Sequence, residues 1–172
     1  MDLGQPNRVA GDGVALRPWR PQDAAAVAPM RDDPVVRRWS SLPHGVDAWL
    51  ERQRSKPDGV SFALTGAGDD RAVGKMALGH LDLDARHAEL SYWVLPAARG
   101  RGLAARGART LAAWGFEALG LRAVLLDIDV DNAPSRRVAE ALGARPRDAP
   151  HVETDRNGVP RELLVYELRP SG

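Results

Sequence analysis

The stretch YWVLPAARGRGLAARGARTL, residues 92–111, passes from an apolar segment through a proline into alternating arginines and glycines, and then becomes alanine-rich. The pattern predicts a strand that ends at Leu95, a glycine-containing turn, and a helix over residues 102–119 that stops at Gly120. Such a turn directs the first N–H groups of the helix, and the positive end of its dipole, to one place. Arg99 and Arg101 can add charge-assisted hydrogen bonds there. The stretch therefore predicts an anion site, with a plain solvated loop as the alternative.

The elements on either side of this stretch predict one mixed α/β domain over residues 13–172, preceded by a flexible lead-in at residues 1–12. RAVLLDIDV, at 122–130, is almost continuously apolar, which is typical of a central strand. The last strands should form a hairpin with its turn near Asn157 and Gly158, a dipeptide that favours tight hairpins. We expect strands at residues 13–19, 60–65, 72–84, 88–95, 122–130, 144–152 and 161–168, and helices at residues 20–33, 34–39, 47–56, 102–119 and 132–143.

Composition excludes several classes of protein. The chain has 172 residues and no cysteine, so it has no disulfide, no thiolate metal site and no cysteine nucleophile. Its four histidines are scattered without a metal-binding pair, and a formal charge of +1 argues against nucleic acid as a partner. No run of about 20 apolar residues is present, and the first residues are unlike a signal peptide. We therefore expect a cytoplasmic protein without metal, nucleic-acid or membrane partners.

Two known loop patterns fit the arginine–glycine turn. The letters GRGLAA at 100–105 satisfy the G-x-G-x-x-A pattern of dinucleotide-binding folds, and Asp127 or Asp129 follows at a suitable distance. However, residues 96–99 separate the strand from the first glycine, and no series of strand–helix–strand units follows. A dinucleotide-dependent oxidoreductase is therefore the less favoured alternative. The second pattern is R-x-x-G-x-A, formed by Arg99, Gly102 and Ala104.

With this second pattern the sequence resembles the GNAT superfamily of acyl-CoA-dependent N-acyltransferases, over roughly residues 13–169. The flanks AELSYWVL at 88–95 and NAPSRRVAEALGA at 132–144 resemble the branch that acetylates the N-termini of ribosomal proteins, the RimJ/RimL type. Members of that branch commonly read E-x-G-Y-W and N-x-x-S-x-x-V-x-E-x-L-G. This chain departs from the pattern at Ser91, where the branch usually has a glycine before the residue that corresponds to Tyr92.

The resemblance implies a mixed, mostly antiparallel sheet with helices on both faces, splayed between its fourth and fifth strands, here residues 88–95 and 122–130. It also implies acetyl-CoA as the co-substrate, with its pantetheine arm along Val94 and Leu95, where backbone N–H groups can polarise the thioester carbonyl. Dimers are common for this fold, and a homodimer is therefore an option here. The residues expected to hold the pyrophosphate are Arg99, Gly100, Arg101, Gly102, Leu103 and Ala104.

Acetyl transfer to an amine needs a neutral amine and a stabilised leaving thiolate. An α-amine has an ordinary pKa of about 8, so a modest base suffices. Glu89, on the strand that leads to the splay, is our candidate, with His151 and Glu153 as alternatives.

The remaining site residues are implied by the resemblance. Ser135 would donate a hydrogen bond to the thiolate, and Asn132 would hold cofactor or substrate amides. Of the neighbouring Arg136 and Arg137, Arg137 is the preferred contact of the nucleotide phosphate, with an ordinary surface charge as the alternative. Plain capping of a helix start is the alternative for Asn132 and Ser135.

The acceptor site is expected among the first helices, the final hairpin and the strand before the splay. Trp39, His44 and Tyr92 are the candidates there, although Trp39 also fits simple helix packing. Together these features predict an N-acetyltransferase that acts on the N-terminal α-amine of a protein or on a small-molecule amine, by direct attack in a ternary complex. A non-catalytic acyl-CoA-binding module on the same fold is the alternative.

Overall fold

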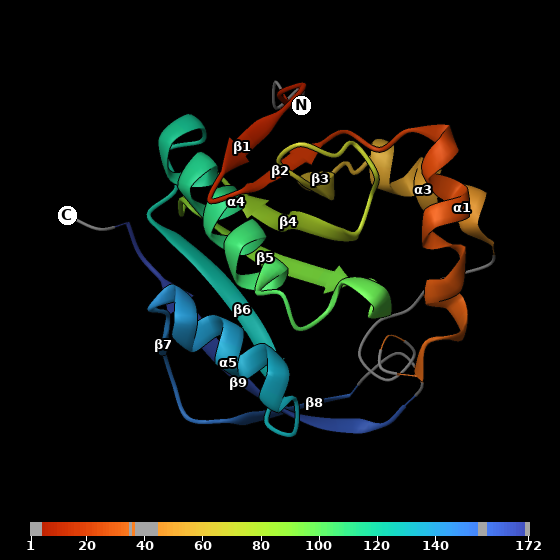
Figure 1. Cartoon of the computed structure of the whole chain (residues 1–172). Helices are drawn as coiled ribbons and strands as arrows, with labels where there is room; N and C mark the ends of the chain where they lie inside the picture. Colours follow the sequence, from red (N-terminus) through yellow and green to blue (C-terminus); the bar gives the residue numbers. More distant parts are fainter. Residues whose placement is uncertain (1–4, 35, 37–44, 155–157, 171–172) are drawn as a thin grey trace.

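The computed structural model describes residues 5–34, 36, 45–154 and 158–170 of the chain. Its centre is a sheet with the strand order β1-β2-β3-β4-β5-β6-β9-β7, in which β8 also pairs with β9 (Figure 1). Among these described strands, β5 and β6 are the one parallel pair of neighbours. The strands are β1 (Val9–Gly11), β2 (Val14–Arg17), β3 (Val60–Gly66), β4 (Gly74–Asp82), β5 (His87–Val94), β6 (Ala123–Asp129), β7 (Arg145–Pro146), β8 (His151–Thr154) and β9 (Pro160–Leu168).

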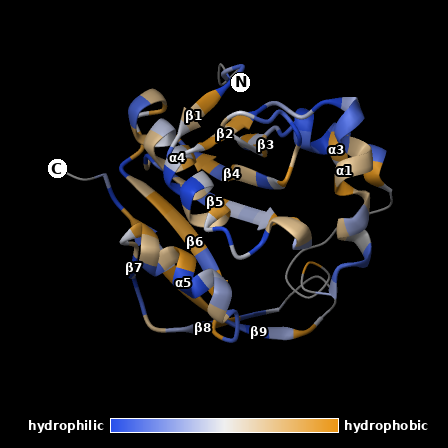
Figure 2. Cartoon of the chain, viewed as in Figure 1, coloured by the Kyte–Doolittle hydropathy of each residue, from blue (hydrophilic) through white to orange (hydrophobic). Residues whose placement is uncertain are grey.

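Helices cover both faces of the sheet, and the alternation of side chains along β5 shows which face each one covers. Leu90 and Val94 pack in one cluster with Leu111 of α4, whereas Trp93 packs in a second cluster with Trp49 of α3. β6 is hydrophobic along much of its length, as its sequence predicts (Figure 2). One face carries α4 (Leu103–Ala118) and α5 (Ala133–Leu142), and the other carries η1 (Pro21–Asp23), α1 (Ala24–Val27), η2 (Ala28–Asp32) and α3 (Val46–Arg54).

The sheet opens between β5 and β6. Their parallel pairing runs from His87 opposite Ala123 to Glu89 opposite Leu125, and within the described residues it goes no further. β5 nevertheless continues to Val94, where it is still paired with β4. The predicted mixed sheet, splayed between residues 88–95 and 122–130, is therefore confirmed. These two strands are the fifth and sixth of the structure because β1 adds one strand at the start.

Four local features differ from the sequence prediction. β1 lies within residues 1–12, which we expected to be a lead-in, and pairs with β2. The segment 144–152 forms two short strands, β7 and β8, on the same side of β9, since Pro146 and Pro150 lack the N–H that a continuous ladder needs. The predicted helix at 20–33 is divided into η1, α1 and η2, with Pro29 inside it. Helix α3, predicted at residues 47–56, begins at Val46 with Gly45 as its N-cap and ends at Arg54.

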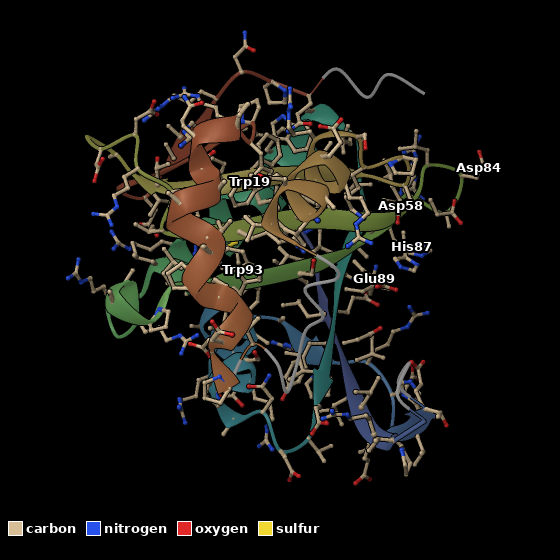
Figure 3. All side chains as sticks on the ribbon, turned by 90° about the vertical axis from the view of Figure 1, so that its right-hand side faces the viewer. Trp19, Asp58, Asp84, His87, Glu89 and Trp93 are labelled. Atoms are coloured by element: carbon tan, nitrogen blue, oxygen red, sulfur yellow. The ribbon has the colours of Figure 1, made fainter. Side chains whose placement is uncertain are left out.

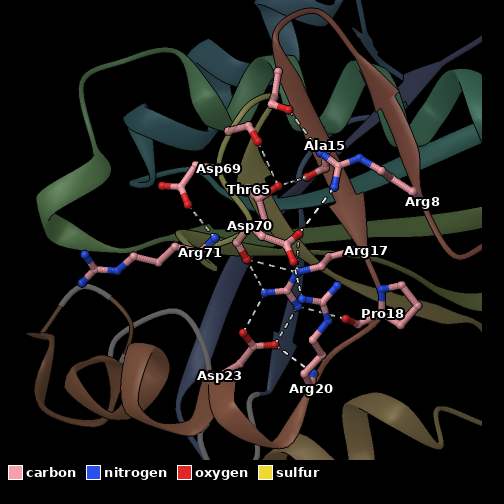
Figure 4. A network of polar contacts seen from close by, with 12 residues as sticks. Arg8, Ala15, Arg17, Pro18, Arg20, Asp23, Thr65, Asp69, Asp70 and Arg71 are labelled. Carbon is pink, nitrogen blue, oxygen red and sulfur yellow. Dashed lines mark hydrogen bonds and ion pairs between the residues drawn. The ribbon is translucent and has the colours of Figure 1, made fainter.

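A buried ion pair fastens the first helical segments to the sheet (Figure 4). Arg17, at the end of β2, donates to both carboxylate oxygens of Asp23 at 2.8 Å, and both side chains are buried. Arg17 also donates to the carbonyl oxygen of Asp70, in the turn between β3 and β4, at 2.6 Å. The exposed side chain of Arg20 contacts the carboxylate of Asp70 as well. These contacts hold η1 and α1 over the sheet face that carries Trp93 and Glu89.

Candidate active site

The glycine-rich turn after β5 has the backbone conformation that its sequence requires. A short helical segment, η3 (Pro96–Ala98), leads to Gly100 and Gly102, whose φ angles are +76° and +68°. A residue with a Cβ is strained in this left-handed region. A Cβ built at either glycine meets nothing within 4 Å. The glycines are therefore needed for the path of the backbone, and the space beside them is open.

The N-terminus of α4 begins at this turn without a capping side chain. Gly102 is the N-cap residue, and among the described residues no side chain accepts a hydrogen bond from the first turn. The first four N–H groups of an α-helix have no partner within the helix, and Arg106 N, donating to Gly102 O at 3.1 Å, closes its first turn. The start of α5 differs, because Asn132 Oδ1 accepts a hydrogen bond from Ser135 N at 3.3 Å. The mouth of α4 is thus suited to an external anion.

The arginines near this mouth have different surroundings. Arg99 Nε donates to Val94 O at 3.0 Å, and its guanidinium forms an ion pair with Asp33 at 3.0 Å. Arg99 therefore ties the turn to the end of β5 and to the first helical segments. Within the described residues, the exposed side chains of Arg101 and Arg137 have no hydrogen-bond or ion-pair partner. Of the arginines predicted to contact phosphate, Arg101 and Arg137 can therefore do so without breaking an existing hydrogen bond or ion pair.

The end of β5 presents backbone groups to the opening. Leu95 N donates to Val73 O at 2.9 Å, on the side of β4. Because successive residues of a strand point their N–H and C=O groups to opposite sides, those of Val94 and Tyr92 point toward β6. Beside these two residues β6 no longer pairs with β5, and the Val94 carbonyl oxygen already accepts the hydrogen bond from Arg99 Nε. The N–H groups of Tyr92 and Val94 are thus placed to bind an extended ligand.

Tyr92 and Ser135 lie near each other on the side of the opening that α4 and α5 cover. The Tyr92 hydroxyl is buried and has no hydrogen bond of good geometry within the described residues. Burial raises the pKa of Tyr92, and the nearby Ser135 hydroxyl opposes that rise. A buried hydroxyl without a partner costs free energy, so the pair fits a site that a ligand completes.

Glu89 points to the opposite face, among charged side chains from neighbouring strands (Figure 3). Burial and the charge of Asp127 on β6 raise the pKa of Glu89, and Glu153 on β8 adds to the rise. Burial and Glu153 also raise the pKa of Asp127. His80 Nε2, 3.9 Å from Glu89 Oε2, opposes both shifts. A carboxylate with a raised pKa is a better proton acceptor, which suits a general base.

The predicted site residues therefore fall into two groups around one opening. Ser135 and Asn132, at the start of α5, lie on the side of Tyr92. Tyr92 was predicted to contact the acceptor, but its side chain lies with this group and not on the face of Glu89. His151 and Glu153, 3.2 Å apart, belong with Glu89. The other two acceptor candidates, Trp39 and His44, lie outside the described residues.

Sequence reasoning missed three side chains on the face of Glu89. Asp127 was named only as part of the dinucleotide-binding pattern, although the alternation in VLLDID places its side chain on the outward face of β6. His80 carries no sequence signal, since its place depends on an irregularity in β4. Lys75 Nζ donates to Ser91 Oγ at 3.1 Å, and burial lowers the pKa of Lys75 to about 8.

Two further functions find little support in the described part of the chain. Those residues contain no group of three or more His, Asp or Glu side chains arranged to hold a metal ion. The single parallel pair among the described strands, β5 and β6, is not the series of parallel strands that a dinucleotide-binding fold requires. None of the described helices has the length and apolar character that crossing a membrane demands.

Comparison with known proteins gives a family match and related structures. Residues 14–145 match the family described as Acetyltransferase (GNAT) domain. A curated relative, "Putative ribosomal N-acetyltransferase YdaF" of Bacillus subtilis (strain 168), is 28% identical, with 90% of each chain covered. A solved structure of "a putative ribosomal-protein-serine acetyltransferase" from Vibrio cholerae is 20% identical with a TM-score of 0.81, over 95% of this chain and 97% of that one. Mycobacterium smegmatis RimJ, in complex with CoA-disulfide, is 23% identical with a TM-score of 0.74, over 95% and 84% of the two chains. These two structural matches support the fold.

Proposed function

The chain belongs to the GNAT acetyltransferase domain family and is an acyltransferase, and we propose that it moves the acetyl group of acetyl-CoA to a primary amine by direct attack in a ternary complex. The observation that carries the proposal is the end of the β5–β6 pairing at Glu89 and Leu125, beside the uncapped mouth of α4. An opening of this kind admits an extended thioester from one side and an amine from the other.

The residues present fit acetyl-CoA. The first turn of α4 and the two left-handed glycines suit a pyrophosphate, with Arg101 beside them as a cation that has no partner in the described part of the chain. Arg99 would act mainly by holding the shape of the turn, because its guanidinium is already engaged. The N–H groups of Tyr92 and Val94 would hold the pantetheine arm, and acetyl-CoA would supply the activated acetyl group.

The Tyr92 hydroxyl, which has no hydrogen-bond partner among the described residues, supports the position of the thioester. It is buried near Ser135, so the two hydroxyls could share a ligand atom at the opening. We propose that Ser135 donates a hydrogen bond to the departing sulfur and that Tyr92 helps to orient it. Asn132 supports this role indirectly, since it holds the first turn of α5 through Ser135 N.

Glu89 would act as the general base. It lies on the face opposite Tyr92, so an amine approaching from that face would meet the carboxylate before it reaches the thioester. Asp127 and Glu153 add negative charge that attracts a protonated amine, and the raised pKa of Glu89 suits removal of its proton. The chain has no cysteine to carry an acetyl group, which is consistent with direct transfer.

We further propose that the acceptor is a peptide or protein α-amine, with a small-molecule amine as the alternative. An α-amine, with an ordinary pKa of about 8, loses its proton far more readily near neutral pH than a lysine side chain does. The B. subtilis relative is named a ribosomal N-acetyltransferase, which favours a protein acceptor.

The test is an acceptor screen with acetyl-CoA, read by thiol release and by mass spectrometry of the products. It should include peptides with free and blocked N-termini, polyamines and free amino acids. We expect acetylation of free N-termini and none of the blocked peptides. Binding of acetyl-CoA without turnover on any amine would instead favour the non-catalytic module.

A further inference from the structure

An irregularity in β4 places His80 in an unusual backbone conformation. β4 and β5 pair regularly from Gly74 to Gly79, which lies opposite Glu89; the register then shifts before Asp82 pairs with His87. His80 lies within this shift and has a φ angle of +47°. Such a φ is uncommon for a residue other than glycine and costs free energy, so something must hold it there.

Asp58 holds the irregularity from the neighbouring loop. Its Oδ2 accepts a hydrogen bond from His80 N at 3.3 Å, and its carbonyl oxygen accepts one from Leu81 N at 3.1 Å. Lys56 Nζ donates to Asp58 Oδ1 at 2.7 Å, and this bond is the main reason that the pKa of Asp58 is lowered. An ionised Asp58 thus fixes the backbone on both sides of the shifted position.

As a consequence, the His80 ring lies beside the Glu89 carboxylate and is also exposed to solvent. Nε2 lies 3.9 Å from Glu89 Oε2, while 74% of the His80 side chain and 40% of the Glu89 side chain are exposed. Both exposed side chains need only a small rotation to come within hydrogen-bond distance of each other, and a histidine at this place can then exchange a proton with the carboxylate on one side and with bulk water on the other.

The other charged groups around Glu89 are less well placed for this exchange. Asp127 on β6 and Glu153 on β8 are acids that oppose ionisation of Glu89. His151, on β8, is 3.2 Å from Glu153 and faces that carboxylate. His87 precedes Glu89 by two residues on β5 and has a weaker effect on its pKa than His80 has.

We propose that His80 is the proton relay of the acetyl-transfer reaction. The inference rests on the proposed function, with Glu89 as base. The attacking amine nitrogen forms the bond to the acetyl carbon, the carbon–sulfur bond breaks, and the amine proton passes to the Glu89 carboxylate. Glu89 then gives this proton to His80 Nε2, and the imidazolium releases a proton from Nδ1 to water. Glu89 is then ionised again, and exchange with water returns the remaining ring proton from Nε2 to Nδ1, so both side chains regain their starting states before the next turnover.

The test is chemical rescue of His80→Gly. Glycine adopts the φ of position 80 without strain, so the irregularity in β4 is kept while the ring is removed. We expect kcat to fall about tenfold, less than the roughly 100-fold or more that a general acid or base contributes, because Glu89 itself is kept, and we expect added imidazole to restore it. Glu89→Gln should not respond to imidazole, and His87→Gly, the matched control on β5, should keep most of its kcat. An unchanged kcat in His80→Gly, or a fall that imidazole does not repair, would overturn the relay.

A second measurement separates this inference from the proposed function. Glu89 can be titrated by NMR with ¹³C-labelled glutamate carboxylates in the wild type, His80→Asn and His87→Asn. Since His80 lowers the pKa of Glu89, its loss should raise that pKa, and more than the loss of His87 does. An unchanged Glu89 titration in His80→Asn refutes the coupling even in an active enzyme. If the wild type acetylates no amine, the proposed function fails and the relay fails with it, whereas the titration still reports the coupling.

Discussion

Replacing Gly102 by valine separates the role of this glycine in the fold from its role in binding. Gly102 has a φ angle of +68°, and a Cβ there meets nothing within 4 Å, so the variant has strain but no clash. A side chain in the left-handed region costs about 1–2 kcal/mol. If the turn relieves that strain by moving, the first N–H groups of α4 no longer converge on a phosphate. A loss of about 1.4 kcal/mol corresponds to a tenfold rise in Kd, so we expect acetyl-CoA to bind roughly tenfold more weakly.

Gly120, just after α4, is a matched control. Its φ angle is +65°, and a Cβ there also meets nothing within 4 Å. Gly102→Val and Gly120→Val should therefore lose a similar free energy of unfolding, measured by urea denaturation. Isothermal titration calorimetry with acetyl-CoA should show the weaker binding in Gly102→Val alone. Equal affinities in the two variants would refute the assignment of the α4 mouth to the pyrophosphate.

Three further variants test the chemistry and electrostatics of the site. Glu89→Gln should lower turnover most below pH 8 and should flatten the rise of kcat with pH. That rise depends on ionisation of the base, whose pKa is raised. An unaltered pH–rate profile would count against Glu89 as the base. Ser135→Ala should reduce kcat more than acetyl-CoA affinity in steady-state assays, and the reverse would make it a binding residue. The pKa of Lys75 is lowered from 10.5 to about 8, so the folded state binds fewer protons than the unfolded state between these values, and stability should rise with pH across that window. At about 1.4 kcal/mol per pKa unit, the free energy of unfolding should rise by roughly 3 kcal/mol across it. Lys75→Met should abolish this rise in denaturation curves recorded at several pH values. A rise that persists in the variant would contradict the burial of Lys75 as its cause.

Much of the sheet could be predicted because its residues repeat at the period of the element they form. The alternation in AELSYWVL and the apolar run in RAVLLDIDV mark β5 and β6, and the glycines after β5 mark the turn to α4. The two ends of α5 could also be predicted. Asn132 can accept a hydrogen bond from the first turn of a helix, and Gly143 readily adopts the left-handed conformation that ends one. β1 was missed because a three-residue edge strand is too short for its alternation to stand out.

The site was only partly predictable, since several of its features depend on contacts between distant segments. The engagement of Arg99 by Asp33 joins residues that are far apart in sequence, so the motif alone suggested a phosphate contact. The separation of Tyr92 from Glu89 follows from the alternation of β5 and could have been read in advance. The approach of His80 to Glu89 could not, because it needs the irregularity in β4 that Asp58 supports.

A crystal structure of the chain with acetyl-CoA is the most direct test of the account. We predict that pyrophosphate oxygens will accept hydrogen bonds from the N–H groups of Leu103 and Ala104, and that the pantetheine arm will lie between β5 and β6 beside Val94. The thioester should lie between Glu89 on one face and Ser135 on the other. A ligand bound elsewhere, with the opening between β5 and β6 filled by the protein's own side chains, would contradict it.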